Sequence, residues 1–264
     1  MSDNKNSVLT DVITPMSNAI QQNLPNTANE TDGAISTVVG FFNNVVLYPV
    51  KKANLTFRYK LEDFEDDLKK KTQHIPEENL QVPPVMIAGP VLEGLRYTYD
   101  EEELREMYEN LLSSAMDNRT VYKTHPSFVD AIKQMSAIDA HVVKRLSELK
   151  DIRCVKFTFS VKNTTKEYVD AMPNYFIEEL FELGDPFILS SSLINLQRLG
   201  IITIIEGGLK GTDYETIKKH PYVIARETLY RQSGEYDFDI SMSKYAVVIN
   251  NYGKQFIETC LQNR

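Results

Sequence analysis

Residues 100–116 read DEEELREMYENLLSSAM, the clearest helical pattern in the chain. Apolar side chains recur every three or four residues and fill one face of the predicted helix: Leu104, Met107, Tyr108, Leu111, Leu112, Ala115 and Met116. Asp100 is placed to cap the first turn, and Glu103 follows three residues later in a capping-box-like arrangement. We expect this helix to end near Asp117 and to pack in a bundle.

Two further helices are predicted upstream of this stretch. Between residues 57 and 68, apolar side chains recur with a helical period and acidic side chains occupy the other face. Three lysines at 69–71 lie in the last turns, where positive charge complements the helix dipole. Residues 85–97 form a short apolar segment, and a helix is predicted to begin within it at Pro90, since proline suits a first helical position.

Downstream of residue 116 the helices continue to about residue 152, and from residue 153 the pattern changes to a mixture of strands and helices. Pro126 begins one predicted helix, and Ser136 with Asp139 caps the next. Residues 153–161 alternate apolar and polar side chains, which is typical of a half-buried strand. The elements predicted after it are helices at 174–183 and 186–199, strands at 201–205 and 245–249, and a last helix at 252–261. Asp185 is the predicted cap of the helix at 186–199, and the glycines at 207, 208 and 211 form the turn after the strand at 201–205.

These elements indicate a mainly α (α+β) fold. The predicted organisation is a flexible tail over 1–32, a helical bundle over 33–152 and a winged-helix-like domain over 153–264. The tail is rich in Asn, Ser, Thr and Gln, which is typical of disorder. The winged-helix prediction rests on the order helix, Leu-Gly-Ile strand, loop and strand.

Amino-acid composition limits which binding partners and which cellular compartment the protein is expected to have. The chain has 264 residues, a net charge of −8 and 42% apolar residues, which suffice for a sizeable core. Residues 176–264 carry nine Lys or Arg against twelve Asp or Glu, so they contain no hidden basic module and nucleic-acid binding is disfavoured. Two distant cysteines, Cys154 and Cys260, favour a reducing compartment and are interpreted as buried structural thiols. We predict a cytoplasmic location, with membrane association as a second option.

The sequence contains no catalytic or metal-binding motif. Its four histidines are scattered, and none belongs to a His-Glu-x-x-His pattern. Consecutive acids at 101–103 diverge around a helix and indicate a solvated first turn. The glycines at 207, 208 and 211 lack the spacing of a phosphate-binding loop. We therefore assign no catalytic, cofactor-binding or metal-binding residue, and we predict a protein that is not an enzyme and uses no cofactor.

Residues 33–50 form an uncharged run with a helical period. Its polar residues and Pro49 lower its hydrophobicity below that of a typical membrane span, which favours a packing helix. An interfacial or inducible membrane contact is the alternative. The residues assigned to this contact with a membrane or partner are Phe41, Phe42, Val45, Val46 and Leu47.

Several motifs resemble those of the Abi-alpha (abortive infection alpha) family of bacterial and prophage proteins. They are Gly89-Pro90-Val91-Leu92-Glu93, the stretch 100–112, His125-Pro126-Ser127-Phe128-Val129, Gln134-Met135-Ser136 and the terminal Tyr252-Gly253-Lys254-Gln255-Phe256. The resemblance covers residues 33–264 and implies a protein that limits phage spread by disabling the infected cell. It implies no catalytic residue, and the matching positions are interpreted as caps and core.

Three functional hypotheses follow. The favoured one is a non-enzymatic phage-defence factor that acts through a phage or host protein or through a membrane, with the 33–50 helix as its effector; homo-oligomerisation stays open. The first alternative is a winged-helix nucleic-acid-binding regulator, although the helix at 186–199 offers only Arg198 as a positive charge. The second is an unrecognised nuclease or hydrolase assembled from distant carboxylates.

Overall fold

The computed structural model describes residues 30–42, 56–162, 167–168, 172–232 and 237–262. These residues form two compact units. Unit 1 comprises the described residues up to Lys133 together with those from Thr259 onward, and unit 2 runs from Gln134 to Glu258. The elements are mostly helices with one small antiparallel sheet, which confirms the mainly α (α+β) prediction.

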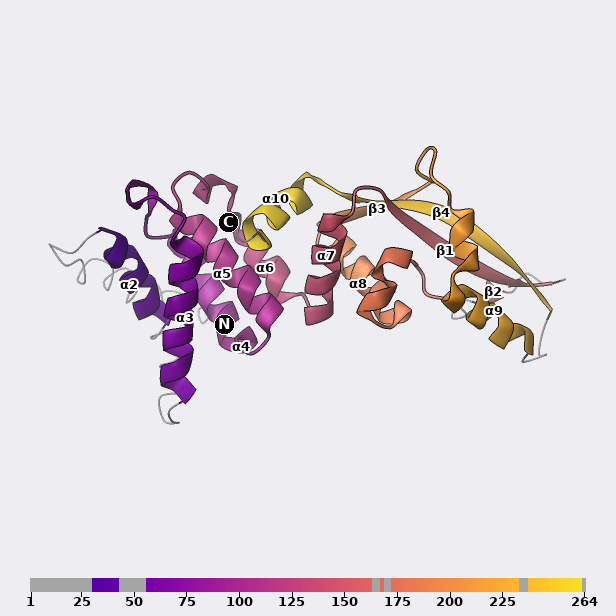
Figure 1. Ribbon diagram of the computed structural model, residues 1–264, viewed down its shortest axis with the longest axis horizontal. Coiled ribbons are helices and arrows are strands. Elements are labelled where there is room, and N and C mark those ends of the chain that lie inside the picture. Colours follow the sequence, from indigo (N-terminus) through magenta and orange to yellow (C-terminus); the bar gives the residue numbers. More distant parts are fainter. Residues whose placement is uncertain (1–29, 43–55, 163–166, 169–171, 233–236, 263–264) are drawn as a thin grey trace, which may run out of the picture. The chain divides into compact units, whose positions relative to one another are not determined.

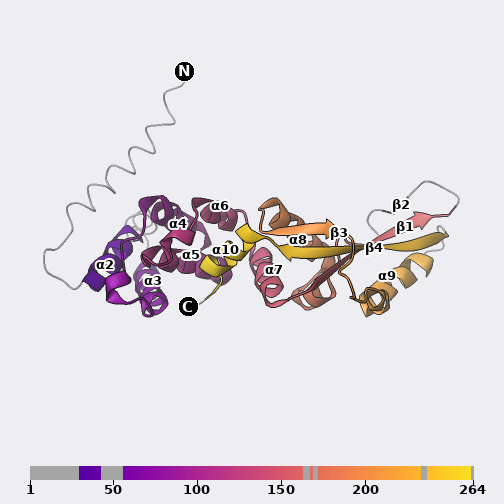
Figure 2. The ribbon, with the colours of Figure 1, turned by 90° about the horizontal axis from the view of Figure 1, so that it is seen from above.

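Unit 1 is built from helices that follow the predicted apolar period. They are α2 (Glu30–Phe42), α3 (Thr56–Thr72), α4 (Val85–Thr98), α5 (Glu102–Met116) and α6 (Pro126–Lys133), with 3-10 turns η3 (Glu77–Asn79) and η4 (Val121–Lys123). Helices α3, α4 and α6 all contact α5 (Figure 2). Every residue of α5 from Met107 to Met116 is buried. Helix α5 is therefore the centre of the unit, and it ends beside Asp117 as predicted.

Helix α4 begins at Val85 and not, as predicted, at Pro90. Pro84 precedes its first turn, and the carbonyl oxygen of Pro84 accepts from the amides of Ile87 and Ala88 at 2.9 Å. Pro90 lies inside the helix, where a proline removes a backbone hydrogen bond. Burial of the apolar face, which includes Ile87 and Val91, holds the helix together across this position.

Asp100 does not cap α5. The helix begins at Glu102, and Glu101 stands at the capping position without a side-chain hydrogen bond. The Asp100 carboxylate instead accepts from Lys60 Nζ of α3 at 2.7 Å. A charge partner on another helix therefore takes the place of the local bond that the capping pattern predicted.

Unit 2 holds the sheet. Its elements are α7 (Ala137–Glu148), β1 (Ile152–Val161), β2 (Glu167–Tyr168), η5 (Glu178–Leu183), α8 (Pro186–Arg198), β3 (Ile202–Glu206), η6 (Glu215–Lys219), α9 (Pro221–Gln232), β4 (Phe238–Ile249) and most of α10 (Asn251–Cys260). The strands pair antiparallel in the order β2-β1-β4-β3. Strand β4 pairs with β1 from Ile152↔Val247 to Val161↔Phe238, and with β3 from Ile202↔Ile249 to Glu206↔Tyr245.

The core of unit 2 lies between the sheet and the helices on one side of it (Figure 1). Helix α8 packs against α7 and β3, while α9 packs beside η6. One buried cluster joins β1 and β4 to η6 and α9 through Val155, Phe157, Phe159, Met172, Phe176, Tyr214, Ile217, Val223 and Phe238. Two predicted caps are confirmed: Ser136 and Asp139 form a capping box on α7, and Asp185 accepts from the first amides of α8.

The predicted helix at 174–183 is wrong in its first part. The Phe176 amide donates to Val155 O at 2.9 Å, and the Val155 amide donates to Phe176 O at 3.0 Å. This bridge to β1 extends the chain at Phe176, so only the 3-10 turn η5 forms afterwards. The predicted strand at 245–249 is also longer, because β4 begins at Phe238, and α9 lies in the segment between β3 and β4.

The boundary between the units differs from the expected one between residues 152 and 153. Unit 2 already begins at Gln134 and includes α7. Asn195 of α8 explains this, because its Nδ2 donates to Gln134 O and to Asp139 Oδ2, both at 3.0 Å. These bonds join the start of α7 to α8. Of the predicted tail over 1–32, residues 1–29 lie outside the described residues, and α2 begins at Glu30.

Candidate functional site

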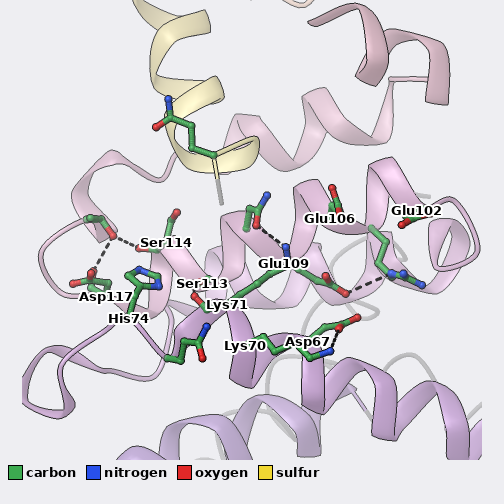
Figure 3. A pocket seen from close by; sticks show the side chains of 15 residues that line it. Asp67, Lys70, Lys71, His74, Glu102, Glu106, Glu109, Ser113, Ser114 and Asp117 are labelled. Atoms are coloured by element: carbon green, nitrogen blue, oxygen red, sulfur yellow. Dashed lines mark hydrogen bonds and ion pairs between the residues drawn. The ribbon is translucent and has the colours of Figure 1, made fainter. Parts of the chain in front are cut away.

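A polar cavity of about 370 Å³ lies between α3 and α5 in unit 1. Figure 3 shows side chains of the two helices facing each other across it. Its acidic lining residues are Asp67, Glu102, Glu106, Glu109 and Asp117, and its basic ones are Lys70, Lys71 and Arg105. The remaining lining residues are Gln73, His74, Asn110, Ser113, Ser114, Thr120 and Gln262. Ligand cavities in proteins commonly begin at about 300 Å³, so this one is large enough for a small molecule.

The wall that α5 contributes is a stripe of polar side chains on a buried helix. Glu109, Ser113 and Asp117 recur every four residues, so they lie one above another on one face. All three are buried. Because a buried polar group is destabilising unless it is paired, each of these side chains requires a partner.

Most of the polar side chains have such a partner within the unit. Lys71 Nζ of α3 donates to Asn110 Oδ1 at 2.8 Å, and Asn110 Nδ2 donates to Cys260 O at 3.0 Å. Ser113 Oγ donates to Lys71 O at 2.8 Å. These bonds join α3 and the last turn of α10 to α5. They are structural contacts among residues that line or adjoin the cavity.

Asp117 is also a paired charge. Arg119 donates to both of its carboxylate oxygens, with Nη2 at 2.7 Å from Oδ2. These bonds hold the pKa of Asp117 below its usual value. Asp117 is therefore ionised and structurally occupied. Among the described residues, no three His, Cys, Asp or Glu side chains are grouped so that they could hold a metal ion.

Glu109 is a buried carboxylate of the cavity with an oxygen that has no hydrogen-bond partner in the described part of the chain. Its side chain is 2% exposed, and the oxygen without this partner is Oε1. Burial, followed by repulsion from Asp67, raises the pKa of Glu109 to about 7, although Lys71 and Arg105 act in the opposite direction. Glu109 thus exchanges its proton near neutral pH. Perturbed carboxylates of this kind in a cavity are typical of functional sites.

Arg105 stands one helical turn before Glu109. Its Nε lies 3.7 Å from Glu109 Oε1, which is close enough for an ion pair but too long for a hydrogen bond. Nη1 donates to Tyr99 O at 3.3 Å, and the guanidinium lies over the Tyr99 ring at 5.2 Å. These contacts fix the side chain while leaving the buried Nε without a hydrogen-bond partner among the described residues.

The residues assigned from sequence to a membrane or partner contact do not line this cavity. Phe41 and Phe42 lie in α2 and are buried in the folded unit, so they are not exposed contacts in this structure. The Phe42 ring stacks on Phe64 of α3 with centroids 4.0 Å apart. Val45, Val46 and Leu47 lie outside the described residues. Among the residues that the structure describes, no helix is both long and apolar enough to cross a membrane.

Both cysteines are buried and free, as predicted. Burial raises the pKa of the Cys154 and Cys260 thiols to about 12. A thiol with so high a pKa is protonated at neutral pH and is a poor nucleophile. Neither cysteine is therefore suited to nucleophilic chemistry.

The cavity is not among the sequence-based predictions, although the sequence contains a signal for it. Besides the apolar face of α5, the polar residues Glu109, Ser113 and Asp117 share a second face with the same helical spacing. A helix that carries two such faces must bury the polar one if it lies at the centre of a bundle. That central position depends on the packing of α3, α4 and α6, which the sequence pattern does not define.

The comparison with protein families matches the abortive infection alpha model to residues 56–260. The chain belongs to this family. The match covers most of the chain and confirms the resemblance found in its motifs. No curated protein and no solved structure is significantly similar to the chain.

The motif positions that carry the family resemblance have structural roles here. Asn250 Oδ1 accepts from the Gly253 amide at 2.9 Å and so caps α10. A Cβ atom on Gly253 would lie 2.0 Å from Ile201 O, so only glycine fits against that backbone. Pro126 begins α6, and Ser136 caps α7. These positions thus define where helices start and how closely they approach their neighbours.

Proposed function

We propose that this abortive infection alpha protein is a non-enzymatic defence factor whose effector is α2, released from unit 1 upon infection. The family match supports a role in abortive infection. The observation that carries the mechanism is that residues 33–42 of α2, as far as the structure describes their side chains, contact the rest of the unit through apolar groups. The absence of catalytic motifs from the sequence supports a role in binding.

The apolar face of α2 is buried between the helix and its neighbours α3 and α4. It consists of Ala34, Ile35, Val38, Phe41 and Phe42, all at most 9% exposed. Phe42 stacks on Phe64 and tilts against Tyr99 with centroids 5.7 Å apart. Exposure of such a face creates a contiguous apolar patch, which is the kind of surface that binds proteins or membrane interfaces.

No polar contact reinforces this attachment within the described residues. From Gly33 to Phe42, the one side-chain hydrogen bond of α2 runs from Thr37 to Gly33 O inside the helix itself. Apolar contacts are non-directional, so the same face can exchange α3 and α4 for another apolar surface without leaving a hydrogen bond unpaired. A partner with higher affinity for this face would shift the equilibrium towards release.

The partner in this proposal is a phage or host protein or the inner face of a membrane. The corresponding location is the cytoplasm, with membrane association after release. A homo-oligomer formed through the released face is compatible with the same mechanism. All three share one requirement, which is that the apolar face of α2 leaves α3.

Substitutions in α3 and α2 can distinguish the release of α2 from the toxic effect of its apolar face. Phe64→Ala removes the ring on α3 that holds Phe42 and leaves the face of α2 intact, so we expect toxicity on expression without phage. Phe42→Asp also weakens the attachment but places a charge on the effector face, so we expect no toxicity. Ser36→Asp is the matched control, because it adds the same charge to an exposed position of α2.

The readouts are growth of bacteria expressing each variant, with and without phage, and the thermal melt of each purified protein. If Phe64→Ala and Phe42→Asp are equally toxic, the face of α2 is not the effector. If Ser36→Asp abolishes defence as completely as Phe42→Asp, charge alone explains the effect. A culture that collapses at high phage multiplicity and survives at low multiplicity is the result expected of the unmodified protein.

The winged-helix-like description of unit 2 belongs to the same proposal. The order α8, β3 and β4 supports it, although α9 lies where a simple wing would be a turn. Arg198, the only basic residue of α8, donates to Asn195 and to Gln134 Oε1. The exposed side chains of α8 include Phe187, Ile188 and Ile194. This surface favours a protein partner over nucleic acid, and salt-dependent binding of duplex DNA would reverse that preference.

A further inference from the structure

Two buried polar atoms of the α3–α5 cavity lack hydrogen-bond partners among the described residues. They are Arg105 Nε, a donor, and Glu109 Oε1, an acceptor, 3.7 Å apart. Both side chains line the cavity and form an ion pair with each other, and Figure 3 shows Glu109 among the lining side chains of α5. Buried donors and acceptors in folded proteins are nearly always paired with protein or water, so this pair calls for a partner.

One molecule that carries an acceptor beside a donor can pair with both atoms at once. Its carbonyl oxygen would accept from Arg105 Nε, and its adjacent N–H would donate to Glu109 Oε1. Such a ligand restores both missing hydrogen bonds at two buried atoms, where each bond is stronger than in solution. A ligand that offers two acceptors or two donors would leave one of the buried atoms unpaired.

The charges around the cavity select against an ionic ligand. Five acidic and three basic side chains line it, so a phosphate ester or carboxylate would meet net repulsion. Arg105 and Lys71, the two charges that lower the pKa of Glu109, would repel a cation placed beside that carboxylate. The ligand that fits is therefore uncharged, and the volume of about 370 Å³ limits it to a small molecule.

We propose that this cavity binds an uncharged small molecule that presents an N–H donor beside a carbonyl acceptor, as the lactam edge of uracil or guanine does. This binding activity is additional to the release of α2 and does not depend on it. A nucleoside base and a primary amide share this edge, so the test includes a probe from each source.

The test measures binding to the purified full chain by isothermal titration calorimetry at pH 8, where Glu109 is ionised. The nucleoside probe is uridine, and its matched control is 3-methyluridine, which has lost the N–H but kept both carbonyl groups. We expect uridine to bind at least tenfold more tightly than 3-methyluridine. We expect uridine 5′-monophosphate to bind more weakly than uridine, because the phosphate meets the acidic lining.

N-acetylglutamine methylamide is the amide probe. If this amide binds and uridine does not, the cavity recognises adjacent N–H and carbonyl groups, and its ligand is an amide and not a nucleoside base. Equal affinities for uridine and 3-methyluridine would overturn the proposal, because the N–H would then make no contact. Failure of every probe to bind would also overturn it, since water alone would then fill the cavity.

Glu109→Met removes the proposed acceptor, Glu109 Oε1, and keeps a side chain of similar length. We expect at least a tenfold loss of affinity for the bound probe. Glu101→Gln is the control, because it neutralises an exposed acid at the start of α5 that does not line the cavity, and we expect it to bind as the unmodified chain does. A thermal melt of each variant establishes folding. The comparison of uridine with 3-methyluridine needs no variant and stands if Glu109→Met does not fold.

Discussion

Gly94 of α4 lies directly against the phenol of Tyr108 of α5. A Cβ atom at Gly94 would stand 2.5 Å from both Cζ and the hydroxyl oxygen of Tyr108. Tyr108 is fully buried, and its hydroxyl has no hydrogen-bond partner in the described chain. The absence of a side chain at Gly94 therefore sets how closely α4 approaches the central helix.

Gly94→Ala is expected to destabilise the fold by about 1–3 kcal/mol, the usual range for overpacking a core. Denaturant unfolding measures the change. Tyr108→Leu should relieve the clash, so a double-mutant cycle is expected to show favourable coupling between the two substitutions. Gly40→Ala is the control: nothing lies within 4 Å of its Cβ position in α2, and alanine there should stabilise the helix by up to ~1 kcal/mol. Equal effects at the two glycines would contradict the close approach.

Glu109→Gln is expected to stabilise the protein, and more so as pH rises. Burial raises the pKa of Glu109 from 4.5 to about 7. Between these pH values the unfolded chain loses the proton first, so the folded state loses stability as pH increases, by at most ~3 kcal/mol above pH 7. Below pH 4.5 both states are protonated and the difference disappears.

The measurement is the free energy of unfolding of Glu109→Gln and of the unmodified chain at pH 4.5 and pH 8. The gain should be near zero at the lower pH and largest at the higher one. Glu102→Gln, at an exposed position, should show little difference between the two pH values. A pH-independent effect of Glu109→Gln would mean that the carboxyl titrates normally.

Asn250 and Gly253 should both be required at the start of α10. Asn250→Ala removes the cap and also the bond from Nδ2 to Gly200 O at 2.8 Å, so we expect a loss of about 1–2 kcal/mol. Gly253→Ala should cost more, because the Cβ atom would meet the Ile201 carbonyl and backbone cannot move aside as a side chain can. Thermal unfolding ranks the two variants, and the reverse order would refute this account.

Cys154 and Cys260 should resist alkylation in the folded protein. Both are fully buried, and their thiol pKa values of about 12 leave almost no thiolate at pH 8. We expect iodoacetamide to label both thiols in denaturant and neither in native buffer, as read by mass spectrometry. Rapid native labelling of either cysteine would show that its surroundings open without global unfolding.

Local patterns in the chain were sufficient for most of the regular elements. Helix α3, the end of α5, the start of α6 at Pro126, the caps at Ser136 and Asp185, and strand β1 all follow from residues within a few positions of one another. Where prediction and structure differ, a distant partner intervenes: Lys60 binds Asp100, and Val155 bridges Phe176.

The sequence by itself determined the mainly helical fold class, the period of each buried face and the family. Only the tertiary structure decided that the polar face of α5 closes a cavity around Glu109. The physical reason is the range of the interactions. Periodicity and capping act between neighbours in the chain, whereas the bonds that enclose the cavity join Asn110 to residues 39 and 150 positions away. Burial of Glu109, and with it the shift of its pKa, exists only after those segments have come together.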